Sequence, residues 1–223
     1  MNLKQAIRER HSVRRYTDRK IERETVAALR AEIDACNVEG GLHIQLVTDE
    51  PKAFDSFLAH YGKFSDVSNY IALVGRKSGS LDERAGYYGE RIVLLAQTLG
   101  LNTCWVAATF GKGAAKKNCT IGRAEKLICV IALGYGETQG VQHKSKPMEN
   151  LYKAEGKLPG WFRAGMETAL LAPTAVNQQK FLFTLSGDTV KAESTGGPYS
   201  KVDLGIVKCH FEIGAGKENF KWA

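Results

Sequence analysis

The sequence predicts an α+β fold in which a mixed sheet wraps around a central buried helix, with flanking helices outside. Residues 82–99 form a helical pattern whose apolar side chains cover a wide arc, and Gly100 supplies a stop signal directly after it. Apolar runs at 70–74 and 127–133 are typical of strands covered on both faces. A helix with so wide an apolar arc needs contacts on most of its surface, so we place it at the centre.

The first part of the chain adds helices and a strand around this centre. Asn2 is a good cap for a short helix over residues 3–9, and an apolar stripe predicts a second helix over 25–36. Alternation with a period of two predicts a half-buried strand over 42–47. Pro51 suits the first turn of a further helix.

The second part of the chain continues this mixture. A buried strand is predicted over 102–107, and a helix over 161–171. Residues 181–193 resemble a hairpin with a turn at its centre. A last helix is predicted over 204–213, and a terminal strand is possible over 220–222.

Composition and continuity indicate one globular unit. The 223 residues are 43% hydrophobic and 25% charged, which is ordinary for a globular protein. No linker, repeat or low-complexity tract is visible, so we expect residues 1–223 to form a single domain. No apolar run approaches the roughly 20 residues of a membrane helix, and residues 1–5 lack a signal-peptide core. We therefore expect a soluble, cytoplasmic protein.

The five cysteines give no sign of a metal site or a disulfide framework. They are scattered and never spaced C-x-x-C, and the nearest histidines, His143 and His210, belong to no cluster of zinc ligands. Cys104 and Cys129 lie in apolar strands, where a thiol acts as a small core residue. Free cysteines fit a reducing compartment.

The net charge of +7 raises the question of nucleic acid. The lysines are spread along the chain, and only Lys112, Lys116 and Lys117 form a loose patch. No basic strand interleaved with aromatic residues is visible, so stacking on single-stranded bases is not indicated. We therefore do not expect nucleic acid as a partner, because a basic surface serves equally well to attract a dinucleotide phosphate.

Several common catalytic motifs are missing. The chain has no G-x-x-x-x-G-K-[ST] loop, no H-E-x-x-H and no G-x-S-x-G. Residues 134–136 lack the third glycine and the following helix of a dinucleotide fingerprint. A nicotinamide cofactor would therefore visit transiently, and hydrolytic chemistry has little support. No side chain is indicated as a general acid or base.

The turn at residues 10–16 concentrates cationic and hydroxyl groups after the first helix. Arg10 and Arg14 each present a planar fork of donors, Ser12 adds a hydroxyl, and His11 adds a ring. This set suits a phosphate attached to a larger, planar ligand. Spacing alone is equally compatible with a solvated, arginine-rich surface.

Four segments carry a resemblance to a known family. Residues 10–16 read RHSVRRY and residues 100–110 read GLNTCWVAATF; ICVIALGYGE at 128–137 is followed by KPMENLY at 146–152. Residues 170–181 read LLAPTAVNQQKF. Together these segments resemble the FMN-dependent nitroreductase family, in a divergent branch. The resemblance implies a nitroreductase-like, mainly antiparallel mixed sheet around the central helix, and FMN as the cofactor.

The resemblance also implies which residues hold FMN. The phosphate, ribityl chain and pyrimidine edge would be bound by Arg10, His11, Ser12 and Arg14. Backbone amides near the reactive flavin nitrogen would come from the segment Val106, Ala107 and Ala108. The flavin edge would be bound by Pro173, Thr174, Ala175, Asn177 and Gln179, with Gln178 at a variable place. Without the resemblance, residues 106–108 read as part of a buried strand, and residues 173–179 read as a polar turn after a helix.

One departure from the family bears on assembly. Its flavin-edge loop normally follows the second helix, but here residues 35–41 are degenerate and the recognisable loop comes about 135 residues later. Lys180 and Phe181 replace the usual proline–aromatic pair. In the family dimer this loop covers the flavin of the other subunit. A homodimer is therefore expected, while a self-contained monomer, whose loop covers its own flavin, stays open.

The leading hypothesis is an FMN-dependent oxidoreductase. NADH or NADPH would act as the transient reductant, and a nitroaromatic, a quinone or a similar small molecule would be the electron acceptor in a ping-pong reaction through flavin N5. The protein would supply binding, orientation and electrostatics. A flavin-binding storage or sensing protein with little turnover is the alternative, and a cofactor-free RNA-associated protein is favoured only by the charge.

Overall fold

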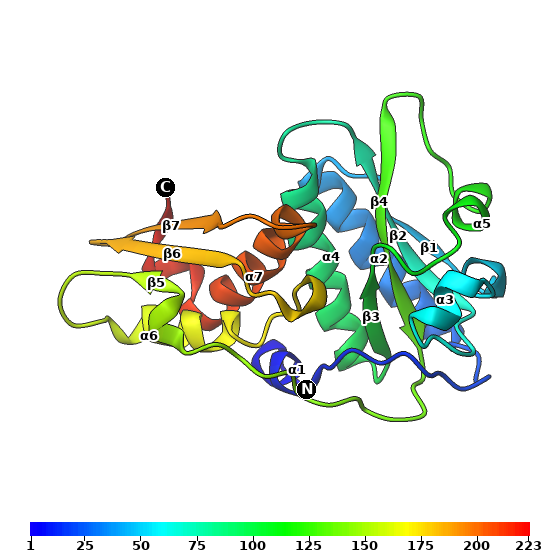
Figure 1. Ribbon diagram of the computed structural model, residues 1–223, viewed down its shortest axis with the longest axis horizontal. Helices are drawn as coiled ribbons and strands as arrows, with labels where there is room; N and C mark the ends of the chain where they lie inside the picture. The colour runs from blue at the N-terminus through cyan, green and yellow to red at the C-terminus, as the bar shows by residue number, and fades with distance from the viewer.

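Two separate four-stranded sheets lie at opposite ends of the molecule, with helices α4 and α7 between them (Figure 1). The computed structural model describes all 223 residues. The first sheet has the order β1-β2-β4-β3, and every neighbouring pair is antiparallel. Its strands are β1 (Gln45–Val47), β2 (Asn69–Arg76), β3 (Asn102–Val106) and β4 (Glu125–Gly134).

The second sheet is smaller and mixed. Its strands are β5 (Tyr152–Lys153), β6 (Phe181–Ser186), β7 (Thr189–Ser194) and β8 (Lys221–Trp222), in that order across the sheet. The β6–β7 pair is an antiparallel hairpin, whereas β5 pairs with β6 and β8 with β7 in parallel. Gly187 has a φ of +62° at the hairpin turn, a conformation that glycine adopts without strain.

Seven α-helices surround and separate the sheets. They are α1 (Leu3–Glu9), α2 (Arg23–Gly40), α3 (Phe57–Tyr61), α4 (Leu81–Thr98), α5 (Lys112–Lys117), α6 (Gly160–Ala169) and α7 (Ser200–Ala215). Single 3₁₀ turns occur at Pro51–Ala53, Met148–Asn150, Ala175–Asn177 and Lys217–Asn219. Asn2 caps α1 by accepting a hydrogen bond from the Gln5 backbone N at 2.9 Å. None of the helices is both long and apolar enough to cross a membrane.

Helices α4 and α7 pack backbone against backbone. A Cβ atom added to Gly86 would lie 2.0 Å from the Val202 carbonyl oxygen, and one added to Gly205 would lie 1.9 Å from that of Glu83. Both glycines therefore exist to allow this close approach. Because α7 buries 13 of its 16 residues, it is as central as α4.

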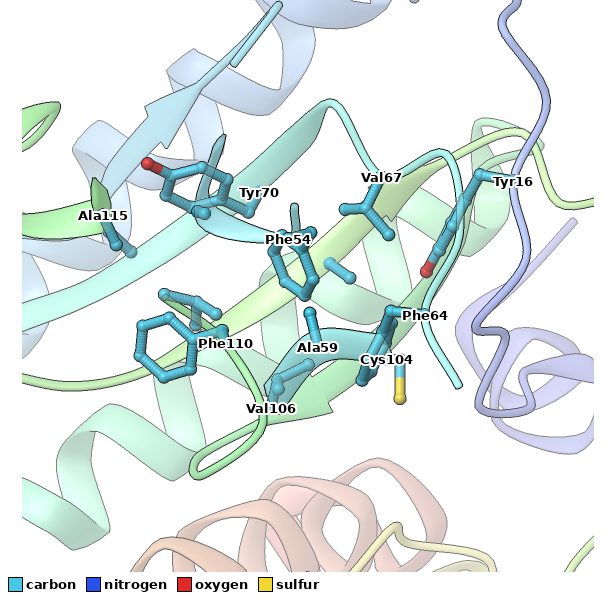
Figure 2. Close-up of a cluster of buried hydrophobic side chains, with 14 of the residues drawn as sticks. Tyr16, Phe54, Ala59, Phe64, Val67, Tyr70, Cys104, Val106, Phe110 and Ala115 are labelled. Carbon is cyan, nitrogen blue, oxygen red and sulfur yellow. The ribbon is translucent and has the colours of Figure 1, made fainter. Parts of the chain in front are cut away.

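Each sheet has its own hydrophobic core. The first sheet packs one face on α2 and α4, and its other face carries an aromatic cluster in which the Phe54 and Phe64 ring centroids lie 5.2 Å apart (Figure 2). The second sheet packs on α6 and α7, where the Phe183 and Phe211 rings stack with centroids 4.7 Å apart. The space between these cores is spanned by α4 and α7.

The predicted fold class and the buried central helix are confirmed. The strands, however, form two sheets, where the sequence suggested one, and α7 shares the centre with α4. Strand β1 is shorter than predicted because the Asn37 side chain takes both backbone hydrogen bonds of Ile44. Asn37 accepts from the Ile44 N–H at 2.6 Å and donates to the Ile44 carbonyl at 2.9 Å. The helix predicted at Pro51 is a single 3₁₀ turn, and α3 follows it.

Candidate functional site

A cavity of about 320 Å³ opens where the two halves of the chain meet. Its volume lies in the range of small-ligand pockets, and its lining is mostly apolar. The first half contributes Ser12, Arg14, Phe64, Cys104, Trp105, Val106, Ala107, Ala108, Thr109 and Cys129. The second half contributes Pro173, Thr174, Ala175, Val176, Pro198, Tyr199, Val202, Asp203 and Ile206. One chain therefore supplies both walls.

The segment after α1, residues 10–16, is held extended along the first sheet; we call it the basic arm. The Val13 backbone N donates to the Thr103 carbonyl at 3.0 Å, and the Ser65 backbone N donates to the Arg14 carbonyl at 3.0 Å. In an extended chain, alternate side chains share a face. Ser12 and Arg14 therefore face the cavity, while Val13 is buried in the first core.

Arg14 is a free cation at the edge of the cavity. Its guanidinium makes no hydrogen bond or ion pair within the chain, and its nearest aromatic neighbour is the Phe64 ring, 5.9 Å from Cζ to centroid. Burial raises the pKa of the Cys104 thiol, and the nearby Arg14 and Ser12 oppose that shift. Cys104 and Phe64, which also line the cavity, lie beside each other (Figure 2). The cavity edge thus carries positive charge beside an apolar floor.

Arg10 and His11 lie outside the cavity lining. Arg10 is only 3% exposed, and its Nε is buried without a hydrogen-bond partner, 3.9 Å from Glu90 Oε1. His11 is half-buried, and desolvation lowers its pKa, with smaller contributions from the charges of Arg10 and His143. The role predicted for these two residues in holding a phosphate stays a prediction.

Glu90 is the centre of a polar network behind the cavity wall, and its side chain and that of His210 are fully buried. Its Oε2 accepts from the indole Nε1 of Trp105, a lining residue, at 2.8 Å. Its Oε1 lies 2.8 Å from His210 Nε2. His210 Nδ1 lies 3.0 Å from the Thr168 carbonyl, which can only accept, so Nδ1 carries a proton. The network fixes Trp105 and joins β3, α4, α6 and α7.

The loop at residues 173–179, the late loop, forms the opposite wall and is held by Asp203 of α7. Asp203 Oδ1 accepts from the Ala175 backbone N at 2.9 Å, and Oδ2 accepts from Gln178 Nε2 at 2.7 Å. Burial raises the pKa of Asp203, and these two hydrogen bonds oppose the shift. The loop has positive φ angles at Val176 and Asn177, +46° and +54°, which are uncommon outside glycine. Asp203 therefore maintains a strained loop.

Asn177 and Gln179 turn away from the cavity. Gln179 is 3% exposed; its Oε1 accepts from the Lys146 backbone N at 2.8 Å, and its Nε2 donates to the Lys144 carbonyl at 2.9 Å. Asn177 Nδ2 donates to the same carbonyl at 2.9 Å. These amides attach residues 144–146 to the late loop. Their predicted contact with a flavin edge stays a prediction.

The mouth of the cavity is apolar. Val176 is 92% exposed, and Tyr199 is 39% exposed with a φ of +57°. The Tyr199 hydroxyl donates to the Ala107 carbonyl at 3.4 Å, from the second half of the chain to the first. A planar apolar ligand could lie against these side chains without contacting water on that face.

Sequence reasoning named eight lining residues and missed others. The eight are Ser12, Arg14, Val106, Ala107, Ala108, Pro173, Thr174 and Ala175. It missed Tyr199, which has no local motif, and Asp203. A carboxylate between the apolar residues Val202 and Leu204, in the first turn of a helix, is the one signal that could have revealed Asp203.

The donor chemistry of the site fits FMN. A phosphate needs cationic and hydroxyl donors, and the cavity lining offers the unpaired guanidinium of Arg14 and the hydroxyl of Ser12. A planar ring system needs an apolar slot with room for close backbone approach, and Ala107 and Ala108 provide small side chains there. No acid–base pair or metal-ligand cluster of three side chains is present at the cavity.

Comparison of the fold with solved structures finds nitroreductases. A "putative nitroreductase" from Thermotoga maritima matches with a TM-score of 0.65 and 25% identity, covering 96% of this chain and 83% of that one. A Desulfovibrio desulfuricans "putative nitroreductase in complex with FMN" matches with a TM-score of 0.54 and 21% identity, over 71% and 99% of the two chains. A Bacteroides thetaiotaomicron "putative NADH dehydrogenase/NAD(P)H nitroreductase" gives 0.53 and 23%, over 67% and 95%.

Sequence comparison is consistent with the shared fold. A search of the curated proteins finds no match. The family model described as "Putative TM nitroreductase" matches residues 2–215, which include the basic arm, the exit of β3 and the late loop. The resemblance noted from the four sequence segments is therefore confirmed at the level of the family. The chain belongs to this nitroreductase family.

Proposed function

We propose that this protein is an FMN-dependent oxidoreductase that uses NADH or NADPH to reduce nitroaromatic, quinone or similar small acceptors, with donor and acceptor alternating at one cavity. FMN would supply the hydride-transfer chemistry at its N5 atom. The observation that carries the proposal is the free guanidinium of Arg14 at the edge of an apolar cavity between the basic arm and the late loop.

The basic arm would bind the phosphate end of the cofactor. Ser12 and Arg14 share the face of the arm that lines the cavity, and Arg10 adds a buried guanidinium whose Nε has no partner. A phosphate near these groups would receive charge-assisted hydrogen bonds, which are stronger than those between neutral groups. The Glu90 carboxylate, 3.9 Å from Arg10 Nε, keeps that guanidinium in place.

The walls of the cavity would position the ring system. Trp105 is fixed from behind by its hydrogen bond to Glu90, and the late loop is fixed by Asp203. Rigid walls reduce the conformational entropy that the wall residues would otherwise lose when a ring binds, and they would hold one face of the ring against the β3 exit. The other face would meet the mouth formed by Val176 and Tyr199, where a nicotinamide and then an acceptor could stack.

The comparisons support a flavin as the cofactor. The Desulfovibrio protein of the same fold was solved with FMN, and the Bacteroides protein is described by NADH and NAD(P)H. The pairing of nucleotide and acceptor in one cavity agrees with the missing dinucleotide fingerprint, because a transient visitor needs no binding motif of its own.

The direct test is the visible spectrum of the purified protein, followed by reduction. We expect a flavin spectrum, bleaching by NADH or NADPH without oxygen, and return of the colour when a quinone is added. Protein that is colourless and gains no flavin absorbance after incubation with FMN would contradict the proposal. That result would leave the hypothesis of a cofactor-free, RNA-associated protein, which is favoured only by the net positive charge.

The alternative is a flavin-binding storage or sensing protein with little turnover. It is favoured by the orientation of Asn177 and Gln179. Their amides bind residues 144–146, so these two polar groups do not point into the cavity. Slow reduction by both nucleotides in a protein that holds FMN tightly would support this alternative. The cytoplasmic location, the single domain over residues 1–223 and the homodimer stay predictions.

A further inference from the structure

We propose that the chain is an internal two-fold pair, in which β7–α7–β8 repeats β2–α4–β3, and that this pairing completes one ligand site inside a single chain. The second, symmetry-related position is closed by its own side chains. That the open site takes FMN rests on the function proposed above, whereas the internal pairing does not.

The two units have matching lengths. Helix α4 begins at Leu81 and α7 at Ser200, 119 residues later, and β3 begins at Asn102 and β8 at Lys221, again 119 residues later. The strand before each helix also corresponds, because β7 begins 119 residues after Tyr70 of β2. A shared spacing over strand, helix and strand is expected of two copies of one supersecondary unit.

The strand directions also correspond. Strand β4 lies between β2 and β3 and runs antiparallel to both, so β2 and β3 are parallel to each other. Strands β7 and β8 are likewise parallel, and here they pair directly. Each unit is thus a strand, a crossover helix and a parallel strand, with an antiparallel strand (β1 or β6) at the other edge of the first strand.

The contact between the helices is reciprocal. Gly86 approaches Val202, and Gly205 approaches Glu83. At the shared spacing, Gly86 corresponds to Gly205, and Glu83 corresponds to Val202. The glycine of each helix therefore contacts the same corresponding position of the other helix, which is the signature of a two-fold interface.

The loops beside the two helices repeat the same arrangement. Arg84 of α4 corresponds to Asp203 of α7 at the shared spacing. Arg84 donates to the carbonyl oxygens of Gly40 and Gly41, in the turn that ends α2. Asp203 accepts from Ala175 and Gln178, in the loop that follows α6. Each residue therefore holds the loop after the helix that precedes its own unit.

The position related to the cavity is filled. A Cβ added to Gly40 would lie 2.6 Å from the Tyr88 ring, so that ring already packs on the α2 turn. Arg91 lies over the same ring at 5.5 Å and forms an ion pair with Glu39. On the open side the counterpart of Tyr88 is Val207, a smaller side chain that is fully buried. The cavity lies on the late-loop side, where Val202, Asp203 and Ile206 of α7 line it.

The repeat is not visible in the sequence because the two helices have diverged. At the shared spacing, residues 81–98 and 200–217 are identical at only two positions: Gly86 with Gly205, and Ala96 with Ala215. The glycine at the helix crossing was kept because any side chain there would separate the helices. The expectation that the sequence contains no repeat concerns the sequence alone, and the repeat proposed here is one of fold.

The consequence is that one chain should bind one ligand without help from a second subunit. A complementation experiment tests this. Arg14→Glu damages only the first-half wall, and Ala175→Trp damages only the second-half wall; circular dichroism verifies that both fold. We expect the wild type to hold one FMN per chain, and equal co-expression of the two variants to yield no FMN above either variant alone.

The contrary result is distinct. If walls came from different chains, half of the molecules in the mixture would be mixed dimers, each with one intact site, so about a quarter of the sites would bind FMN. Recovery near that level would overturn the proposal.

A second experiment needs no flavin, so it separates this inference from the proposed function. Lys208 Nζ of α7 lies 2.8 Å from Glu83 Oε1 of α4, within reach of a zero-length carbodiimide cross-link. Protein labelled with ¹⁵N is co-refolded with unlabelled protein and cross-linked. We expect the Glu83–Lys208 peptide to be entirely labelled or entirely unlabelled, and absent in Glu83→Gln. Peptides of mixed label would place α7 on a partner chain and overturn the internal pairing.

Discussion

Glu90 of α4 and His210 of α7 lie 2.8 Å apart from Oε1 to Nε2, and neither side chain is exposed. Because His210 Nδ1 donates to the Thr168 carbonyl, a further proton must lie between Nε2 and Oε1. Arg10 approaches the same carboxylate from the basic arm. One buried acid therefore connects the arm, the cavity wall and both central helices.

Removal of this acid should be costly. We expect Glu90→Ala to lower the free energy of unfolding by about 3–5 kcal/mol, because it leaves buried polar groups without a partner. Glu90→Gln should cost less, about 1 kcal/mol, because an amide can accept from Trp105 and donate to a neutral His210. Urea unfolding measures both values, and equal losses would contradict the proposed hydrogen-bond network.

Asp203 should make stability depend on pH in the acid range. Burial raises its pKa from the ordinary value of 3.8, so the folded protein binds the proton more tightly than the unfolded chain. This contribution to stability is fully present below pH 3.8 and is lost as the pH rises through the raised pKa.

The measurement compares wild type with Asp203→Asn, whose amide does not titrate. The difference in unfolding free energy should change in favour of the variant as the pH rises from about 3 to 7. A difference that is constant with pH would mean that the carboxyl titrates at its ordinary value.

The helix crossing gives a matched pair of glycine substitutions. Gly205→Ala places a methyl group against the Glu83 carbonyl, and overpacking of this kind costs about 3 kcal/mol. Gly113→Ala, in α5, meets nothing within 4 Å and should stabilise the protein by about 0.5–1 kcal/mol through helix propensity. Thermal unfolding of both variants tests the close approach, which a harmless Gly205→Ala would disprove.

Arg14 and Arg15 form a matched pair of substitutions that distinguishes cofactor binding from an effect of general surface charge. Arg14→Ala should weaken FMN binding by roughly ten- to a hundredfold, the loss of about 1.5–3 kcal/mol expected for a charged hydrogen bond. Arg15 is equally close in sequence, but its side chain is 69% exposed and pairs with Glu137. Arg15→Ala should therefore leave the dissociation constant nearly unchanged, as measured by quenching of flavin fluorescence.

Combining the alanine substitutions of both arginines of the basic arm gives a stronger test of the phosphate site. Arg10→Ala together with Arg14→Ala should abolish the retention of flavin during purification. A folded double variant that stays yellow with a full complement of FMN would refute the assignment of the basic arm.

The helices and strands with strong periodicity were predictable. Residues 82–99 were predicted as a helix and α4 spans Leu81–Thr98, because an apolar stripe and a following glycine are local signals. Helix α5 was missed because it is short, polar and contains Gly113. Strand β5 was missed because it is two residues long and exists only because β6 pairs with it, whereas β8 lies within the terminal strand predicted over 220–222.

The candidate site was predictable only where its residues lie close together along the chain. Ser12 and Arg14 stand two residues apart, a local spacing that puts both on one face of an extended arm. Nothing local shows that Arg10 turns to Glu90, or that Asn177 and Gln179 hold residues 144–146. Those choices depend on which buried partner lies within reach.

The sequence by itself determined the elements, the chemistry of the basic arm and the resemblance to nitroreductases, because periodicity and motif spacing involve residues close along the chain. The tertiary structure alone decided that the late loop lies across the cavity from the arm of its own chain. It also decided that Gly86 and Gly205 bring two diverged helices into a two-fold contact. These relationships join residues more than a hundred positions apart, and they arise from packing, which no local pattern records.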